Sequence, residues 1–249
     1  PPRHQLPDSI RGLLYQKGEN WFRNRYALTR RETAHDMQQM LQLGVNTIRR
    51  YGPGVYDRNV LAEAGSHGMR VHYGFWLPDV TDMDGDSAAL AQAQQSILRT
   101  IARRRNDTAI TAWHLGNNAW QQLALHHFKP GLFYQQQRYL RWLDGLSAAI
   151  KAADPDVLFN PGTAPRLPWL QLQLPAIDAF GMEVTADTSG LAAFLSGNFP
   201  CFISRMPIAA FARLPPVPAF LTTLQDLETR DFVTFDGLTD LRGRYKENW

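Results

Sequence analysis

The chain has 249 residues, 44% of them hydrophobic, which is enough to bury one sizeable core. The formal net charge of +3 arises from 26 basic and 23 acidic residues without a long block of either sign, and no zinc-finger, helix-turn-helix or RNA-recognition signature accompanies it. Nucleic-acid binding is therefore not expected. The single cysteine, Cys201, excludes an internal disulfide framework. The sequence contains no stretch of about 18 apolar residues, so no membrane-spanning helix is predicted in it.

Short β-rich runs alternate with longer amphipathic stretches from residue 12 onward. In the first of these stretches, Thr29 and Glu32 have the spacing of a capping box, and Gly44 follows as a stop signal. Gly68 predicts the end of the second helix in the same way. Further helices are expected at 87–104 and 133–153, with shorter crossovers near 168–174, 188–195 and 208–213.

The β-rich runs occupy residues 12–17, 45–51, 69–75, 110–116, 157–160, 177–182, 201–205 and 218–223. Their alternation with helices predicts βα units around a parallel sheet. Eight units favour an α/β fold of the closed (β/α)₈ or TIM-barrel type over a doubly wound open sheet. In either architecture, ligands bind at the carboxyl ends of the strands. We expect one domain over residues 1–249, forming part of a larger protein.

Three segments stand in order along the chain: Leu43-Gly44-Val45-Asn46-Thr47-Ile48-Arg49, Trp113-His114-Leu115-Gly116-Asn117-Asn118 and Asp236-Gly237-Leu238-Thr239-Asp240-Leu241-Arg242-Gly243-Arg244-Tyr245-Lys246. They resemble the clan A glycoside hydrolases, retaining (β/α)₈ enzymes that include the family-two β-glucuronidases and β-galactosidases. The opening run Tyr15-Gln16-Lys17-Gly18-Glu19-Asn20 also resembles the first strand of that family. The resemblance spans roughly residues 12–246.

The resemblance implies that both catalytic glutamates are replaced. The fourth strand of the clan ends in Gly-Asn-Glu, where the Asn contacts the sugar and the Glu is the acid/base; Asn117 and Asn118 stand at these positions here. The nucleophile position at the end of the seventh strand corresponds to Arg205. Arg49 matches the arginine that holds the nucleophile in the clan. Retaining hydrolysis needs two carboxyl groups about 5–5.5 Å apart, and neither an amide nor a guanidinium can replace them.

Buried cations without a counter-charge are costly, so Arg49 and Arg205 are expected to find carboxylates such as Glu183 or Glu19, or to bind an anionic ligand. We favour the internal ion pair, since structural arginines outnumber ligand-binding ones. Aromatic residues at or just beyond the strand ends could stack on a sugar ring or could simply pack the barrel. They are Tyr51, Phe75, Trp76, Trp113 and Trp120.

No metal site or cofactor is expected. His114 lies on the expected fourth strand, and His126 and His127 lie in an expected loop after Trp120; these histidines lack the spacing of a zinc site. The segment 82–86 lacks the oxygen ligands of an EF-hand and is expected to cap the helix that starts at Ser87. The predicted ligand-binding residues are Arg49, Asn117, Asn118, Trp76, Trp120, Glu183 and Arg205.

The leading hypothesis is a catalytically inactive glycoside-hydrolase-like barrel, a pseudoenzyme that binds a polysaccharide or docks a partner in glycan synthesis or export. The resemblance implies an extracytoplasmic location, periplasmic or secreted, with any membrane segment outside this chain. One alternative is an active glycosidase or transglycosylase that uses relocated carboxylates at Glu183, Glu19 or Asp79. A second alternative is a pure protein-interaction scaffold.

Overall fold

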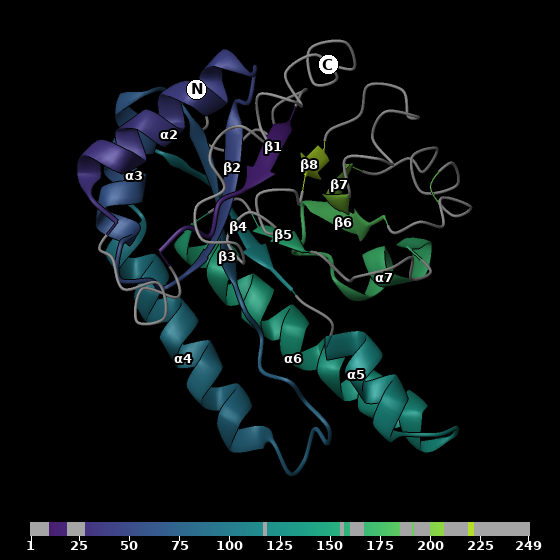
Figure 1. Ribbon diagram of the computed structural model, residues 1–249. Helices are drawn as coiled ribbons and strands as arrows, with labels where there is room; N and C mark the ends of the chain where they lie inside the picture. The colour runs from purple at the N-terminus through teal and green to yellow at the C-terminus, as the bar shows by residue number, and fades with distance from the viewer. Residues whose placement is uncertain are drawn as a thin grey trace.

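The structure, a computed structural model, describes residues 10–18, 28–116, 119–154, 157–159, 167–184, 191, 200–206 and 219–221. Its strands are all parallel, and each pairs with the next one in chain order (Figure 1). The last strand also pairs with the first, so the sheet closes on itself. The predicted α/β class is confirmed. The strands are β1 (Arg11–Leu14), β2 (Thr47–Gly52), β3 (Arg70–Phe75), β4 (Ile110–Leu115), β5 (Val157–Phe159), β6 (Ala179–Glu183), β7 (Cys201–Met206) and β8 (Ala219–Leu221).

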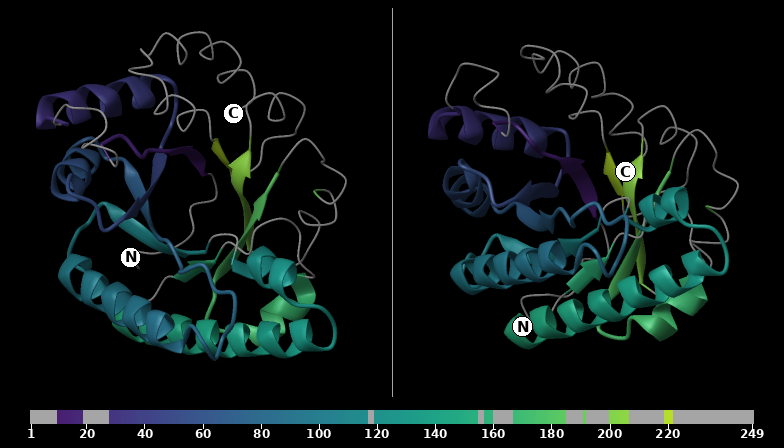
Figure 2. Two further views of the ribbon diagram at one scale, coloured as in Figure 1. Left: turned by 60° about the horizontal axis from the view of Figure 1, so that its bottom comes forward. Right: turned by 90° about the horizontal axis from the view of Figure 1, so that it is seen from below.

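Helices lie on the outside of the sheet, as the three views together show (Figures 1 and 2). The Thr29–Glu32 capping box opens the first of them as predicted. Gly44 and Gly68 follow the first two helices with φ of 85° and 68°, a backbone conformation that favours glycine. The helices are α2 (Arg30–Gln42), α3 (Asp57–Ser66), α4 (Ser87–Arg104), α5 (Ala119–His126), α6 (Gly131–Ala153) and α7 (Leu167–Gln173).

Some predicted elements differ from the structure. The sequence placed His126 in a loop, whereas α5 includes it, because alanine and leucine raise helix propensity over 119–126. Asp86 is the N-cap residue of α4, but its carboxylate accepts hydrogen bonds from the backbone amides of Thr81 and Asp82 instead of capping the helix. The crossover at 208–213 lies outside the described residues, and so does 188–195 except for Leu191.

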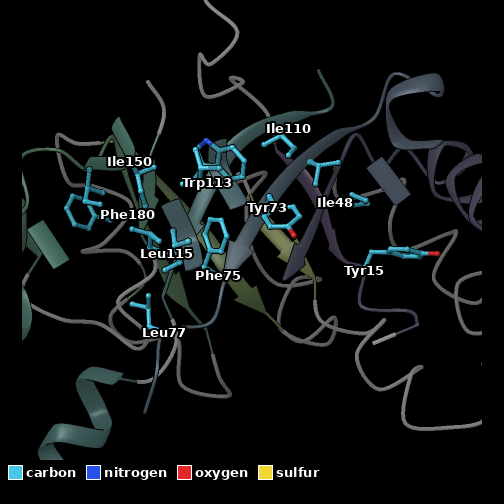
Figure 3. Packing of buried hydrophobic residues seen from close by; sticks show 14 of the residues in the cluster. Tyr15, Ile48, Tyr73, Phe75, Leu77, Ile110, Trp113, Leu115, Ile150 and Phe180 are labelled. Carbon is cyan, nitrogen blue, oxygen red and sulfur yellow. The ribbon is translucent and has the colours of Figure 1, made fainter. Parts of the chain in front are cut away.

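The outer face of β3 and β4 packs against the helices (Figure 3). The ring of Phe75 stacks on that of Trp113 with centroids 5.8 Å apart, and Trp113 Nε1 donates to Asp154 Oδ2, 2.9 Å away, at the end of α6. Both aromatic side chains are almost fully buried. Of the two roles considered for the aromatic residues near the strand ends, Phe75 and Trp113 therefore have the packing role, because alternate residues of a strand face opposite sides of the sheet and these two face the helices.

A buried ion pair joins the outer face of β2 to α3. Arg50 Nε donates to Asp57 Oδ1 over 2.7 Å, and both side chains are buried. The other carboxylate oxygen of Asp57 accepts from the amide of Gly54 and from the hydroxyl of Tyr73. Gly52 has to lack a side chain, since a Cβ there would overlap the Tyr73 hydroxyl. Removing one partner of such a pair leaves an uncompensated buried charge.

Candidate functional site

The inner face of the sheet brings together side chains from β2, β3 and β4. Tyr51, Gly74 and His114 are register neighbours on these three strands. A Cβ at Gly74 would come within 2.6 Å of the Tyr51 ring, so the tyrosine lies directly over the glycine. The Tyr51 ring then meets His114 edge-on, with centroids 5.8 Å apart. Glycine at position 74 is therefore what allows the Tyr51 ring to lie against the sheet.

Trp76 covers Tyr51 from the solvent side. The two rings are stacked with centroids 4.1 Å apart and planes 19° apart. Tyr51 is 4% exposed, whereas Trp76 is 55% exposed and follows directly after the carboxyl end of β3. The Arg49 guanidinium lies 5.5 Å from the centroid of the Tyr51 ring. The result is a supported aromatic surface of the kind that stacks on the apolar face of a sugar.

Near Tyr51, two buried histidines lie on the inner face of the sheet. The rings of His72 and His114 both meet Phe202 of β7, at centroid distances of 6.3 and 6.0 Å. Because β7 lies opposite β3 in the ring of strands, Phe202 reaches across the interior. Burial, and then the charges of Arg49 and Arg70, lower the pKa of His72 to about 3.

Burial, and then Arg49 and His72, also hold the pKa of His114 well below its usual range. Both imidazoles are thus neutral near pH 7, and Arg49 is a cation beside them. Arg49 is 2% exposed, which places its charge beneath the aromatic pair rather than at the surface. Arg49 lies on the same face of β2 as Tyr51, beside these two histidines.

The other predicted site residues differ in where they lie and in whether the structure describes them. Trp120 lies on α5, where its ring is partly buried against the core instead of standing free at the strand ends. The backbone of Arg205 lies on β7, in register with half-buried Glu183 at the end of β6. Asp79 is exposed. Outside the described residues lie Glu19, Asn117 and Asn118.

Gly116 connects β4 to the two asparagines, and its φ of 132° is one that glycine favours. Among the residues that form the eight strands, Glu183 is the single carboxylate. Within the described part of the chain, no three His, Cys, Asp or Glu side chains gather as metal ligands would.

Sequence reasoning missed three contributors to this site. His72, Gly74 and Phe202 were not singled out, and His114 was considered only as a metal ligand. The two-residue period of a strand was the available signal, since Arg49 and Tyr51 share a face, as do His72 and Gly74. Which strand lies opposite β3, and so the role of Phe202, required the closed order of the strands.

Comparison with known proteins finds similar structures but no matching family model or curated sequence. No protein-family model and no curated protein sequence matches the chain. Bacteroides uniformis β-glucuronidase 2 superposes with a TM-score of 0.62 at 18% identity, over 80% of this chain and 25% of that one. A β-galacturonidase from Eisenbergiella tayi, bound to galacturonate, gives 0.57 at 15% identity, over 80% and 36%. The chain therefore spans about a quarter to a third of these enzymes.

The endo-1,4-β-mannanase of Rhizomucor miehei matches over nearly its whole length. Its TM-score is 0.67 at 11% identity, covering 97% of this chain and 95% of that one. At such identities the likeness concerns the fold alone. The chain has the α/β fold of glycoside hydrolases.

Proposed function

We propose that this chain is a glycoside-hydrolase-like (β/α)₈ barrel domain of a longer protein, one that binds a glycan and does not hydrolyse it. The observation that carries the proposal is the half-exposed ring of Trp76, stacked on buried Tyr51 at the carboxyl end of β3. Ligands of parallel α/β folds bind at that end of the sheet.

The layers beneath Trp76 favour a preorganised binding surface. Tyr51 is fixed by Gly74 below it and by the edge of His114 beside it. A rigid aromatic ring loses little conformational freedom when it binds, so more of the stacking energy is kept as affinity. Arg49 places a positive charge below the platform, and the two neighbouring imidazoles are neutral.

The scarcity of carboxylates on the eight described strands supports the loss of hydrolysis. Position 118 holds an amide and position 205 a guanidinium, where the resemblance to clan A implies two glutamates. Glu183 alone on the strands cannot act as both nucleophile and acid/base. We further propose that Asn117, Asn118, Glu183 and Arg205 border the bound glycan.

The experiment is a titration of the chain with oligosaccharides, followed by tryptophan fluorescence and calorimetry. Galacturonate and glucuronate oligomers are the first probes, since two of the structural neighbours are named for acting on such uronides. Manno-oligosaccharides form the second set. We expect Trp76→Ala to weaken binding by about two- to tenfold, because aromatic stacking contributes about 0.5–1.5 kcal/mol beyond the buried area. Tyr134→Ala, which removes another exposed ring from α6, should leave the affinity unchanged.

Two results would reject the proposed function. One is the absence of binding to every glycan tested, which would leave a protein-interaction scaffold. The other is turnover of aryl glycosides that Glu183→Gln abolishes, which would assign catalysis to a relocated carboxylate. We also propose an extracytoplasmic setting, with other components of a glycan synthesis or export system as partners.

A further inference from the structure

Gln16 lies just beyond the end of β1, at the carboxyl ends of the strands. The strand register pairs Leu14 of β1 with Arg49 of β2. Two positions further along each strand, Gln16 therefore stands beside Tyr51 on the inner face of the sheet. Tyr15 points the opposite way, since its hydroxyl donates to a carboxylate of α2 over 2.7 Å. Gln16 thus borders the residue on which the exposed tryptophan stacks.

The backbone of Tyr51 fixes the orientation of the Gln16 amide. The N–H of Tyr51 donates to Gln16 Oε1 over 3.0 Å. Because a backbone N–H can only donate, the oxygen of the side-chain amide faces Tyr51 and Nε2 is directed away from it. The Gln16 side chain is also packed, since the residue is 5% exposed. Its amide group is therefore oriented before any ligand binds.

The Nε2 group of Gln16 is available to a ligand. It has no hydrogen-bond partner in the part of the chain that the structure describes. It is also not among the polar atoms that are buried without a partner, so it contacts solvent. Leu14, the next residue inward on this face, is 3% exposed, which places the solvent-accessible side at the strand ends. Trp76 is exposed on that same side of the sheet.

We propose that Gln16 is a specificity-determining residue of the glycan site and donates from Nε2 to a hydroxyl oxygen of the bound sugar. This inference rests on the proposed function, because it requires a sugar stacked at Trp76. The two residues have different tasks. An aromatic ring holds the apolar face of a sugar whichever hydroxyls that sugar carries. A neighbouring donor distinguishes sugars by the position of one hydroxyl.

The bond to Tyr51 restricts what Gln16 can recognise. Its oxygen is already engaged, so the free end of the amide only donates. The site therefore selects a sugar that presents an acceptor oxygen at this place, and it disfavours one that lacks the hydroxyl there. Because the donor is already oriented, little conformational entropy is lost when the sugar binds.

Two substitutions separate the donor from the support of Tyr51. Gln16→Glu keeps an oxygen that accepts from the Tyr51 N–H and replaces the Nε2 donor by a second oxygen. Gln16→Met keeps the side-chain length and removes both groups. Calorimetry at pH 8, where the glutamate is ionised, measures binding of manno-oligosaccharides and galacturonate oligomers. We expect both variants to lose affinity about two- to tenfold, because each lacks one neutral hydrogen bond to the sugar.

The matched control is Gln42→Glu, which adds the same charge at an exposed position at the end of α2. It should bind like the unmodified chain. Circular dichroism checks that each variant folds. Gln16→Met should also lose stability in urea, since the Tyr51 N–H is left without its acceptor, whereas Gln16→Glu keeps that bond.

Three results overturn the inference about Gln16 and leave the proposed function intact, provided that Trp76→Ala still weakens binding in the same titrations. Unchanged affinity of both Gln16 variants shows that no bond is made to the sugar. A loss in Gln16→Glu alone shows charge repulsion without a contact. A loss in Gln16→Met alone shows that Gln16 acts only by holding Tyr51. Absence of glycan binding by the unmodified chain rejects the inference together with the proposed function.

Discussion

Strands β2, β3 and β4 make different side-chain contacts on their two faces. On the outer face, Arg50 is held by Asp57 from α3, and Tyr73 completes the network. On the inner face, Arg49 lies beside two neutral histidines and under the Tyr51–Trp76 stack. Arg49 and Arg50 are neighbours in the sequence but lie on opposite faces of the sheet, among different side chains. The comparison teaches that helix packing stabilises one face, while the other keeps polar and aromatic groups oriented toward the strand ends.

The largest expected effect comes from breaking the outer network. Asp57→Asn should lower the free energy of unfolding by about 3–5 kcal/mol, because Arg50 would remain buried without its counter-charge. Urea unfolding followed by circular dichroism measures the loss. Asp107→Asn is the control, since it removes the partly exposed Arg104–Asp107 pair and should cost less than about 1 kcal/mol. Equal losses of stability in the two variants would show that the buried Arg50–Asp57 pair contributes no more to the free energy of unfolding than the Arg104–Asp107 pair does.

Gly74→Ala tests the support of the inner face. The added Cβ would meet Tyr51 at 2.6 Å, so the ring must move and carry Trp76 with it. We expect a loss of about 1–3 kcal/mol in stability, a shift in tryptophan emission and weaker glycan binding. Gly145→Ala on α6 is the control: nothing lies within 4 Å of its Cβ, and alanine is the better helix former. An unchanged tryptophan emission spectrum of the Gly74→Ala variant would show that the position of the Trp76 ring does not depend on Gly74.

The inner histidines predict how stability depends on pH. The folded state binds fewer protons than the unfolded state, since the pKa of His72 is about 3 when folded and 6.5 when unfolded, and His114 is shifted in the same direction. This contribution is complete above about pH 6.5 and is lost as the pH falls toward 3. Each histidine can contribute a slope of up to about 1.4 kcal/mol per pH unit.

Urea unfolding at pH 7 and pH 5 measures this slope. His114→Phe, which keeps a ring among Tyr51 and Phe202, should make stability less dependent on pH. The exposed residue His126 is a control, and His126→Asn should not change the slope. Equal stability of the unmodified chain at both pH values would contradict neutral, buried histidines on the inner face.

The smallest expected effect is a recovery of hydrolysis. Asn118→Glu together with Arg205→Glu should give at most weak cleavage of aryl glycosides, and each single change none, because acid/base and nucleophile act as one unit. Arg49 would help a restored carboxyl group at 205 to ionise. Positioning errors of about 1 Å can cost on the order of 10²-fold, which limits the double variant. Strong activity from a single variant would mean that one position is misassigned.

The sequence alone predicted much of the architecture. The capping box at Thr29, the stops at Gly44 and Gly68, and the alternation of β-rich runs with amphipathic stretches led to the α/β class and to most element positions. These signals are local, because they depend on backbone conformation and on periods of 2 or 3.6 residues. Helix α5 was missed, since a short helix beside a longer one leaves little periodic signal.

Only the tertiary structure decided which side chains meet. Trp76 and Trp113 looked alike in the sequence, yet one stands half-exposed on Tyr51 while the other is buried against Phe75 and Asp154. A one-residue difference in strand position moves a side chain to the other face of the sheet, so an aromatic residue near a strand end is ambiguous until the register is fixed. The contact of Phe202 with His72 needed the ring of strands, because it joins residues 130 positions apart across the interior.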